Sequence, residues 1–233
     1  MQFFFKTQIR WPTGCLIFLF VPLCAMHVSC NRPDTLQPLI ITKQDSINVQ
    51  KFINRAFKNM AVLKRGIQSG DLITRTGNDY TSLRLRSLNQ RNQTYSHCGI
   101  ASIENDSLFI YHAVGGEWNP DEKLRRDAFE LFAEPYSNKG IGIFRFAIPD
   151  TTKINLIEVA KQQYSKGLKF DMDFDLKSDD RMYCAEFIYK SFLKASCNRI
   201  VFNTSKIGSF NFIGVDDIFL HPLCSLTQQI VYK

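Results

Sequence analysis

The sequence holds few of the side chains that commonly bind metal ions. It has four histidines, none of them within five positions of another, and its seven cysteines form no Cys-x-x-Cys pair. Structural zinc sites usually carry such closely spaced ligand pairs. The spacing therefore argues against a zinc site, and we expect the protein to need no metal and no other cofactor. A zinc site assembled from His97, His112 and Cys184 is the metal alternative that the pattern leaves open.

Signs of nucleic-acid binding are missing as well. The formal net charge is +7, but no segment alternates lysine or arginine with aromatic residues, and no internal repeat occurs. A scattered basic excess is typical of a solvated surface. We therefore expect no nucleic-acid partner. Phospholipid headgroups or acidic cell-wall polymers suit the charge better.

The first 30 residues have the pattern of an export signal. Lys6 and Arg10 precede a nearly continuous apolar stretch at Gly14–Val28, which is short for a membrane span and typical of a secretory signal peptide. The stretch ends in Ser29 and Cys30, a small residue before a cysteine, which resembles the cleavage box of bacterial lipoproteins. We therefore predict that Cys30 is lipidated. Ordinary cleavage nearby and an uncleaved anchor are the alternatives.

The rest of the chain divides into a tether and one domain. Residues 31–45 predict a tether between the lipid and the protein. Residues 46–233 are long enough for one domain with its own hydrophobic core. A lipid anchor would place this domain at a membrane of the bacterial cell envelope, in the periplasm or attached to the outer membrane.

Hydrophobic spacing predicts helices on both sides of a run of strands. The predicted helices cover residues 46–65, 151–166 and 181–195, and the predicted strands cover 97–104, 108–114, 140–147 and 229–232. A three-residue turn joins the first two strands into a hairpin. Helices that flank antiparallel strands indicate an α+β domain.

The sequence Met-Tyr-Cys-Ala-Glu at 182–186 lies at the start of the most hydrophobic of these helices. A cysteine in the first turn of a helix is close to the positive end of the helix dipole and to unpaired N–H groups. Both favour the thiolate, which is the reactive form of the side chain. Cys184 is therefore a candidate nucleophile. A buried core cysteine is the alternative for the same pattern.

Two histidines on the predicted hairpin are candidates for the groups that activate a thiol. His97 begins one strand, and His112 lies 15 positions later on the partner strand, so the two rings can be neighbours on one face of the sheet. An activated thiol needs a base, and the base needs a group that orients it. We predict His97 as the base and His112 as the orienting group. Glu117 is the alternative orienting group.

Three further cysteines accompany Cys184 in the predicted domain. In an oxidising compartment, the four residues Cys98, Cys184, Cys197 and Cys224 can form two disulfides. If Cys184 is instead a free nucleophile, three cysteines are left and at least one must stay unpaired. The sequence leaves their pairing open.

These motifs, in this order, resemble a known family. The motifs are Gly-Asp-Leu-Ile at 70–73, Ser-His-Cys-Gly-Ile at 96–100 and Tyr-Cys-Ala-Glu-Phe at 183–187. They are similar to those of the permuted papain-like proteins of the YiiX/YebB group, which are relatives of NlpC-type cell-wall peptidases and of lecithin:retinol acyltransferase. The resemblance implies a circularly permuted papain-like fold. In that fold a small, barrel-like antiparallel sheet packs against helices, and the nucleophile lies at a helix N-terminus.

The same resemblance implies roles for single residues. Cys184 falls on the family's nucleophile, His97 on its base and His112 on its third polar position. Many members of the YiiX group have glutamate at this third position, whereas the acyltransferase branch has histidine. This departure leaves the orienting group and the substrate open. Tyr183, directly before the nucleophile, is expected to line the site or to help bind the oxyanion.

The expected activity is that of an exported thiol hydrolase. Such an amidase or peptidase would cleave amide bonds, with cell-wall peptides as the natural substrate, through a Cys–His pair and a thioester acyl-enzyme. A lipid-directed acyl hydrolase or acyltransferase is the first alternative, because His112 and nearby aromatic residues suit an apolar pocket. A non-catalytic binding lipoprotein is the second alternative.

Overall fold

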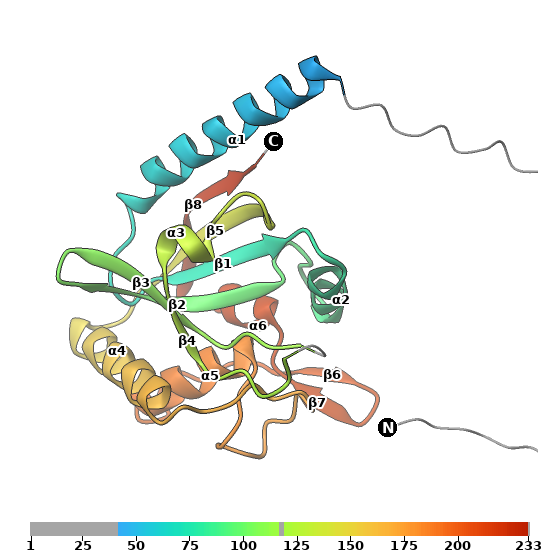
Figure 1. Ribbon diagram of the computed structural model, residues 1–233. Coiled ribbons are helices and arrows are strands. Elements are labelled where there is room, and N and C mark those ends of the chain that lie inside the picture. The colour runs from blue at the N-terminus through green and yellow to red at the C-terminus, as the bar shows by residue number, and fades with distance from the viewer. Residues whose placement is uncertain (1–41, 117–118, 233) are drawn as a thin grey trace, which may run out of the picture. The chain divides into compact units, whose positions relative to one another are not determined.

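An antiparallel sheet of six strands organises the described part of the computed structural model, which comprises residues 42–116 and 119–232. The strands follow the order β4-β3-β2-β1-β5-β8 across the sheet (Figure 1). Their bounds are Leu72–Gly77 (β1), His97–Glu104 (β2), Ser107–His112 (β3), Arg125–Ala128 (β4), Asn138–Phe146 (β5) and Cys224–Val231 (β8). A separate hairpin pairs β6 (Ser205–Ile207) with β7 (Phe210–Phe212).

The helices complete the α+β domain that the sequence predicts. They are α1 (Lys43–Lys64), α2 (Tyr80–Leu88), α3 (Phe129–Phe132), α4 (Asp150–Ser165), α5 (Cys184–Ala195) and α6 (Val215–Phe219). No helix in the described ranges is long and apolar enough to cross a membrane. The predicted signal peptide, the lipidation site Cys30 and residues 31–41 of the predicted tether lie outside the described residues.

The inner strands β1, β2 and β5 are largely buried on both faces of the sheet, and alternating residues of each strand point to opposite sides. Leu72 and Ile100 belong to the core that contains α4, α5 and α6, whereas the adjacent Ile73 and Ala101 belong to the core that contains α1 and α3. Figure 1 shows α4 and α5 on one side of the sheet and α1 and α3 on the other. A sheet buried on both sides is a rigid support for the side chains at its strand ends.

The hairpin of β2 and β3 closes through a two-residue turn. Asn105 and Asp106 have positive φ angles of 47° and 61°, and Glu104 pairs with Ser107. Such turns twist in the same sense as the strands that they join, and Asn and Asp tolerate this backbone region. The predicted three-residue turn is therefore wrong by one residue, because Ser107 is already part of β3.

The first helix begins earlier than the sequence pattern predicts. Thr42 is its N-cap, and the hydroxyl of Thr42 accepts the Asp45 N–H at 3.1 Å while Asp45 Oδ2 accepts the Thr42 N–H at 2.9 Å. This reciprocal capping box satisfies donors that the helix itself leaves unpaired. The predicted start at residue 46 is wrong, because the capping box of Thr42 and Asp45 starts the helix at Lys43.

Short or charged elements are the ones that the hydrophobic pattern does not predict. These are β4, the hairpin of β6 and β7, helix α6 and the first half of β8. Strand β4 has the sequence Arg-Arg-Asp-Ala and lies at an edge of the sheet. Charged edge strands prevent pairing with other chains and give no apolar alternation to detect.

Candidate functional site

Cys184 is the first residue of α5, which begins three residues later than the predicted start at Arg181. Tyr183 precedes it in an extended conformation, and the Tyr183 N–H donates to Glu186 Oε2 at 3.2 Å. Glu186 therefore caps the N-terminus of the helix. Burial raises the pKa of Glu186 to about 7, although Lys190 Nζ, 2.9 Å from Oε1, opposes this shift.

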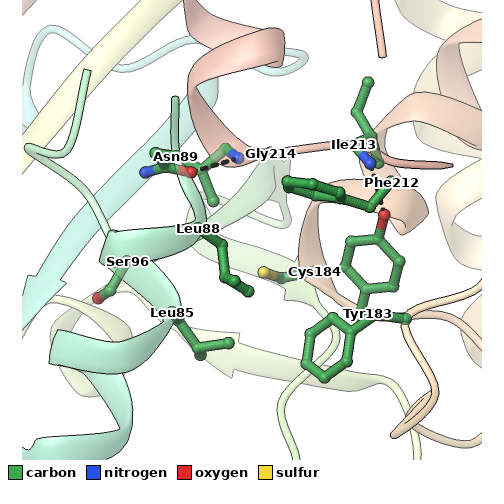
Figure 2. Close-up of a pocket in the computed structure, with 12 residues that line it drawn as sticks. Leu85, Leu88, Asn89, Ser96, Tyr183, Cys184, Phe212, Ile213 and Gly214 are labelled. Atoms are coloured by element: carbon green, nitrogen blue, oxygen red, sulfur yellow. Dashed lines mark hydrogen bonds between the residues drawn. The ribbon is translucent and has the colours of Figure 1, made fainter. Parts of the chain in front are cut away.

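The Cys184 side chain borders a narrow hollow of about 30 Å³ (Figure 2). Its walls come from α2, from the loop before α5, from the start of α5 and from the segment that leads into α6. They are largely apolar: Leu85, Leu88, Phe174, Tyr183, Phe212 and Val215. Cys184 is 6% exposed and lines this hollow.

Several donors surround the Cys184 sulfur. Hydrogen bonding from the Cys98 thiol is the largest cause of a lowered pKa of Cys184. The backbone N–H groups of Ala185 and Cys98 and the positive charge of Arg75 act in the same direction, while burial opposes them. Burial raises the pKa of Cys98 well above its ordinary value, so Cys98 stays protonated and donates. The arrangement favours thiolate on Cys184 and thiol on Cys98.

Replacing Cys98 by alanine should therefore raise the pKa of Cys184. The rate at which iodoacetamide alkylates Cys184 follows its thiolate fraction, so the midpoint of the pH–rate profile should move to higher pH and labelling at neutral pH should slow. Peptide-resolved mass spectrometry at a series of pH values measures the profile. Cys224→Ala is the matched control and should leave it unchanged. An unchanged midpoint in Cys98→Ala would show that the Cys98 thiol does not stabilise the thiolate.

His97, His112 and Asp127 form a hydrogen-bonded chain. His97 Nε2 lies 2.8 Å from His112 Nδ1, and His112 Nε2 lies 3.0 Å from Asp127 Oδ2. A carboxylate only accepts, so His112 Nε2–H donates to Asp127. His112 Nδ1 then accepts, and His97 Nε2–H donates to it. These partners assign the tautomers and leave the Nδ1 lone pair of His97 free to take a proton.

Both rings are neutral in the resting site. Burial, followed by the charges of Arg75 and His112, lowers the pKa of His97 well below its ordinary value. Burial also lowers the pKa of His112 to about 4, although Asp127 opposes this shift. Burial would raise the pKa of Asp127, but its bond from His112 and its pairing with Arg125 outweigh burial and lower it. A neutral His97 is a base and not a resting imidazolium.

Strand register and a glycine bring the two rings together. Ile100 pairs with Tyr111, and continuing this register by one residue places Gly99 opposite His112. A Cβ on Gly99 would lie 2.9 Å from the carbonyl oxygen of Tyr111 and 3.1 Å from His112 Cβ. Because glycine leaves this space open, the His112 ring can lean diagonally toward His97.

The ring of Phe132 supports the two imidazoles. Its centroid lies 5.6 Å from that of His97 and 5.0 Å from that of His112. Phe132 itself is fully buried at the end of α3. Packing on one buried ring restricts the rotamers of both histidines, which fixes the direction of the hydrogen-bonded chain.

Cys184 and His97 border adjoining hollows. The hollow at Cys184 and a more polar hollow of about 360 Å³ at His97 share Leu85 and Ser96 in their walls. Within the described ranges no hydrogen bond joins the Cys184 sulfur to a ring nitrogen of His97. Contacts between catalytic groups are often loose until substrate binds.

Tyr183, Glu117 and the cysteines of the domain are the other residues that the sequence singles out. The Tyr183 hydroxyl accepts the N–H of Ile213 at 2.8 Å (Figure 2), and burial raises the pKa of Tyr183. Glu117, the alternative orienting group, lies outside the described residues. Cys98, Cys184, Cys197 and Cys224 are all free thiols.

The side chains of this site do not fit a metal ion. The described part of the chain contains no group of three or more histidines, cysteines or acidic residues that could hold one. In particular, three of the four ring nitrogens of His97 and His112 are engaged with each other and with Asp127. A zinc ion on His97, His112 and Cys184 would have to break this chain.

Two residues near the site were not predicted from the sequence. Asp127 was missed because β4 has no apolar alternation, so its pairing with β3 could not be anticipated. The sequence marks Arg75 as a possible site residue only weakly, because it is a single arginine within the otherwise buried strand β1. It pairs with His97 across the sheet.

Comparisons with known proteins support the fold. No protein-family model matches the chain, and no curated protein matches it. Among solved structures, the chain is similar to the crystal structure of metalloprotein YiiX from Escherichia coli O157:H7, with 18% sequence identity and a TM-score of 0.58. The match covers 70% of this chain and 98% of that chain. The described domain therefore has a YiiX-like α+β fold.

Proposed function

We propose that this protein is a thiol hydrolase of the circularly permuted papain-like type that cleaves amide bonds. The observation that carries the proposal is the chain from Asp127 through His112 to His97, which leaves a basic nitrogen on His97. The hollow at His97 adjoins the hollow at the helix-start residue Cys184. Base, orienting groups and nucleophile are the parts that thiol catalysis needs.

In the proposed mechanism, the Cys184 sulfur attacks the carbonyl carbon of an amide. His97 Nδ1 takes the proton of the Cys184 thiol, whose lowered pKa eases this transfer, and His112 and Asp127 stabilise the imidazolium that forms. His97 then gives this proton to the leaving amine, which produces a thioester on Cys184. Water, activated by His97, hydrolyses the thioester and restores the thiol.

The solved neighbour is described as a metalloprotein, but no step here passes through a metal. The side chains around Cys184 form no metal-binding group in the described ranges. They do supply a base and a sulfur with a lowered pKa. We further propose export and lipidation at Cys30, which would bring the site to the peptides of the cell wall.

A lipid-directed acyl hydrolase or acyltransferase is the second candidate. A hollow of about 430 Å³ lies next to the narrow one at Cys184, with Leu85 and Phe174 in both walls. Phe170 and Met172 extend its apolar lining. Such a surface suits an acyl chain.

Substrate mixtures distinguish the two candidates. The purified protein and a Cys184→Ala control are incubated separately with cell-wall muropeptides and with phospholipid vesicles, and the products are identified by mass spectrometry. New amine and carboxylate ends in the muropeptides, absent with Cys184→Ala, are expected. Release of fatty acid alone would favour the lipid candidate. If neither mixture yields a product that depends on Cys184, the proposed hydrolase activity is wrong for both substrate classes.

A further inference from the structure

Arg75 lies beside the base of the candidate site. It pairs directly with His97 across β1 and β2, so the two side chains are neighbours on one face of the sheet. The Arg75 guanidinium carbon lies 4.7 Å from the centroid of the Phe132 ring, and its Nη1 donates to the Phe132 carbonyl at 3.0 Å. The same ring packs against His97. Arg75 is thus fixed on the support that fixes the base.

The guanidinium has no carboxylate partner in the described ranges. Asp127, whose charge has the largest effect on Arg75 of any carboxylate, is already bound by His112 and Arg125. Asp79 accepts hydrogen bonds from Ser82. Burial lowers the pKa of Arg75, and the negative charges of Asp127 and of a Cys184 thiolate oppose this shift. A largely buried cation that no carboxylate pairs with is costly to the fold, because its desolvation is not fully repaid. The cost suggests a use for the charge.

Arg75 lines the polar hollow of about 360 Å³ that His97 also lines. Of the charged groups in that wall, Arg125 is paired with Asp127, and Glu122 accepts from Asn119. With Nη1 occupied by Phe132, Nε and Nη2 of Arg75 remain as one fork of parallel donors. One fork matches the two oxygens of one carboxylate.

We propose that Arg75 is a substrate-binding residue that holds a carboxylate of the substrate next to the bond that Cys184 attacks. The inference rests on the proposed function and narrows its substrate class to amides with a free carboxylate close to the scissile bond. A phosphate group is the other anion to consider. A phosphate site usually contains several unpaired cations. In this wall the second arginine, Arg125, is already paired with Asp127, and Asp79 and Glu122 add negative charge.

Two alkylating reagents test this without knowledge of the natural substrate. Iodoacetate carries a carboxylate, whereas iodoacetamide is neutral and otherwise alike. The ratio is the rate of alkylation of Cys184 by iodoacetate divided by the rate with iodoacetamide. Compared with the same ratio for 2-mercaptoethanol, it reports anion binding beside the sulfur. Any change in the pKa of Cys184 cancels in this ratio. We expect the ratio in the wild-type protein to be roughly tenfold higher than for 2-mercaptoethanol, which is the scale of one charge-assisted hydrogen bond.

Variants identify the residue responsible. Arg75→Gln should lower the ratio to that of 2-mercaptoethanol, and Arg75→Lys should keep part of it. Arg126→Gln is the matched control, because Arg126 pairs with Glu104 outside this hollow, and it should leave the ratio unchanged. A reactive Cys184 with no preference for iodoacetate, or an unchanged ratio in Arg75→Gln, would overturn the subsite alone. A Cys184 that reacts with neither reagent would contradict both the subsite and the nucleophile.

A measurement on the wild-type protein avoids any variant that does not fold. Succinate should slow the alkylation of Cys184 by iodoacetamide more than sodium chloride does at equal ionic strength. Inorganic phosphate is tested in parallel. Stronger protection by phosphate than by succinate would overturn the assignment to a carboxylate.

Discussion

Loss of either Cys184 or His97 should reduce amide cleavage by at least about 10³-fold, and loss of both should reduce it no further. Nucleophile and base act as one unit in the proposed mechanism. Once one is removed, the other has no reaction to assist. The variants are Cys184→Ala, His97→Gln and the double variant, compared by product formation from the substrate that the muropeptide and phospholipid incubations identify.

The control for this comparison is Cys197→Ala, since Cys197 is an exposed free thiol away from the site. It should retain full activity. If the fold-losses of the two single variants multiply in the double variant, Cys184 and His97 contribute independently. Full activity in Cys184→Ala would exclude the thiol mechanism altogether.

The second large effect concerns His112. His112→Leu removes the acceptor for the His97 Nε2–H, which leaves the base without an orienting group and with an unpaired buried donor. We expect activity to fall by about 10²- to 10⁴-fold, the range seen when the orienting member of a catalytic triad is altered. The measurement is kcat/KM on the same substrate.

His112→Asn is the informative companion of His112→Leu. The side-chain oxygen of asparagine reaches a position close to that of Nδ1 in histidine and can accept the His97 N–H. The contact with Asp127 is lost, but the orientation of His97 is retained. We expect at least tenfold more activity than in His112→Leu. Tyr111→Phe, on the same strand but in the core with α5, is the control. Equal activity in His112→Asn and His112→Leu would contradict an orienting role.

Local signals in the sequence were sufficient for the parts of the fold that depend on neighbouring residues. The hydrophobic helix that ends at Ala195 and the hairpin around Asn105 and Asp106 follow from spacing and turn chemistry. The helix begins three residues later than predicted, and the turn is one residue shorter. The proximity of His97 and His112 was predicted from their places on that hairpin, and the structure confirms it with a distance of 2.8 Å.

Other parts of the site depend on contacts between distant segments. Asp127 reaches His112 only because a charged edge strand pairs with β3, and nothing in its sequence marks that strand. Arg75 is opposite His97 because of the register between β1 and β2, which no local pattern specifies. The contact between Cys98 and Cys184 joins a strand to a helix across the core. Register and packing decide these positions, so they require the three-dimensional structure.

The activated thiol at Cys184 is the claim on which the proposed chemistry depends, and site-resolved alkylation tests it most directly. The wild-type protein is treated briefly with iodoacetamide at neutral pH, and the labelling rate of each cysteine is followed by peptide mass spectrometry. Cys197 is exposed and serves as an internal reference, whereas Cys184 is 6% exposed. An activated thiolate predicts that Cys184 reacts faster than Cys197 despite its burial. Labelling of Cys184 no faster than that of Cys197 would contradict the proposed nucleophile.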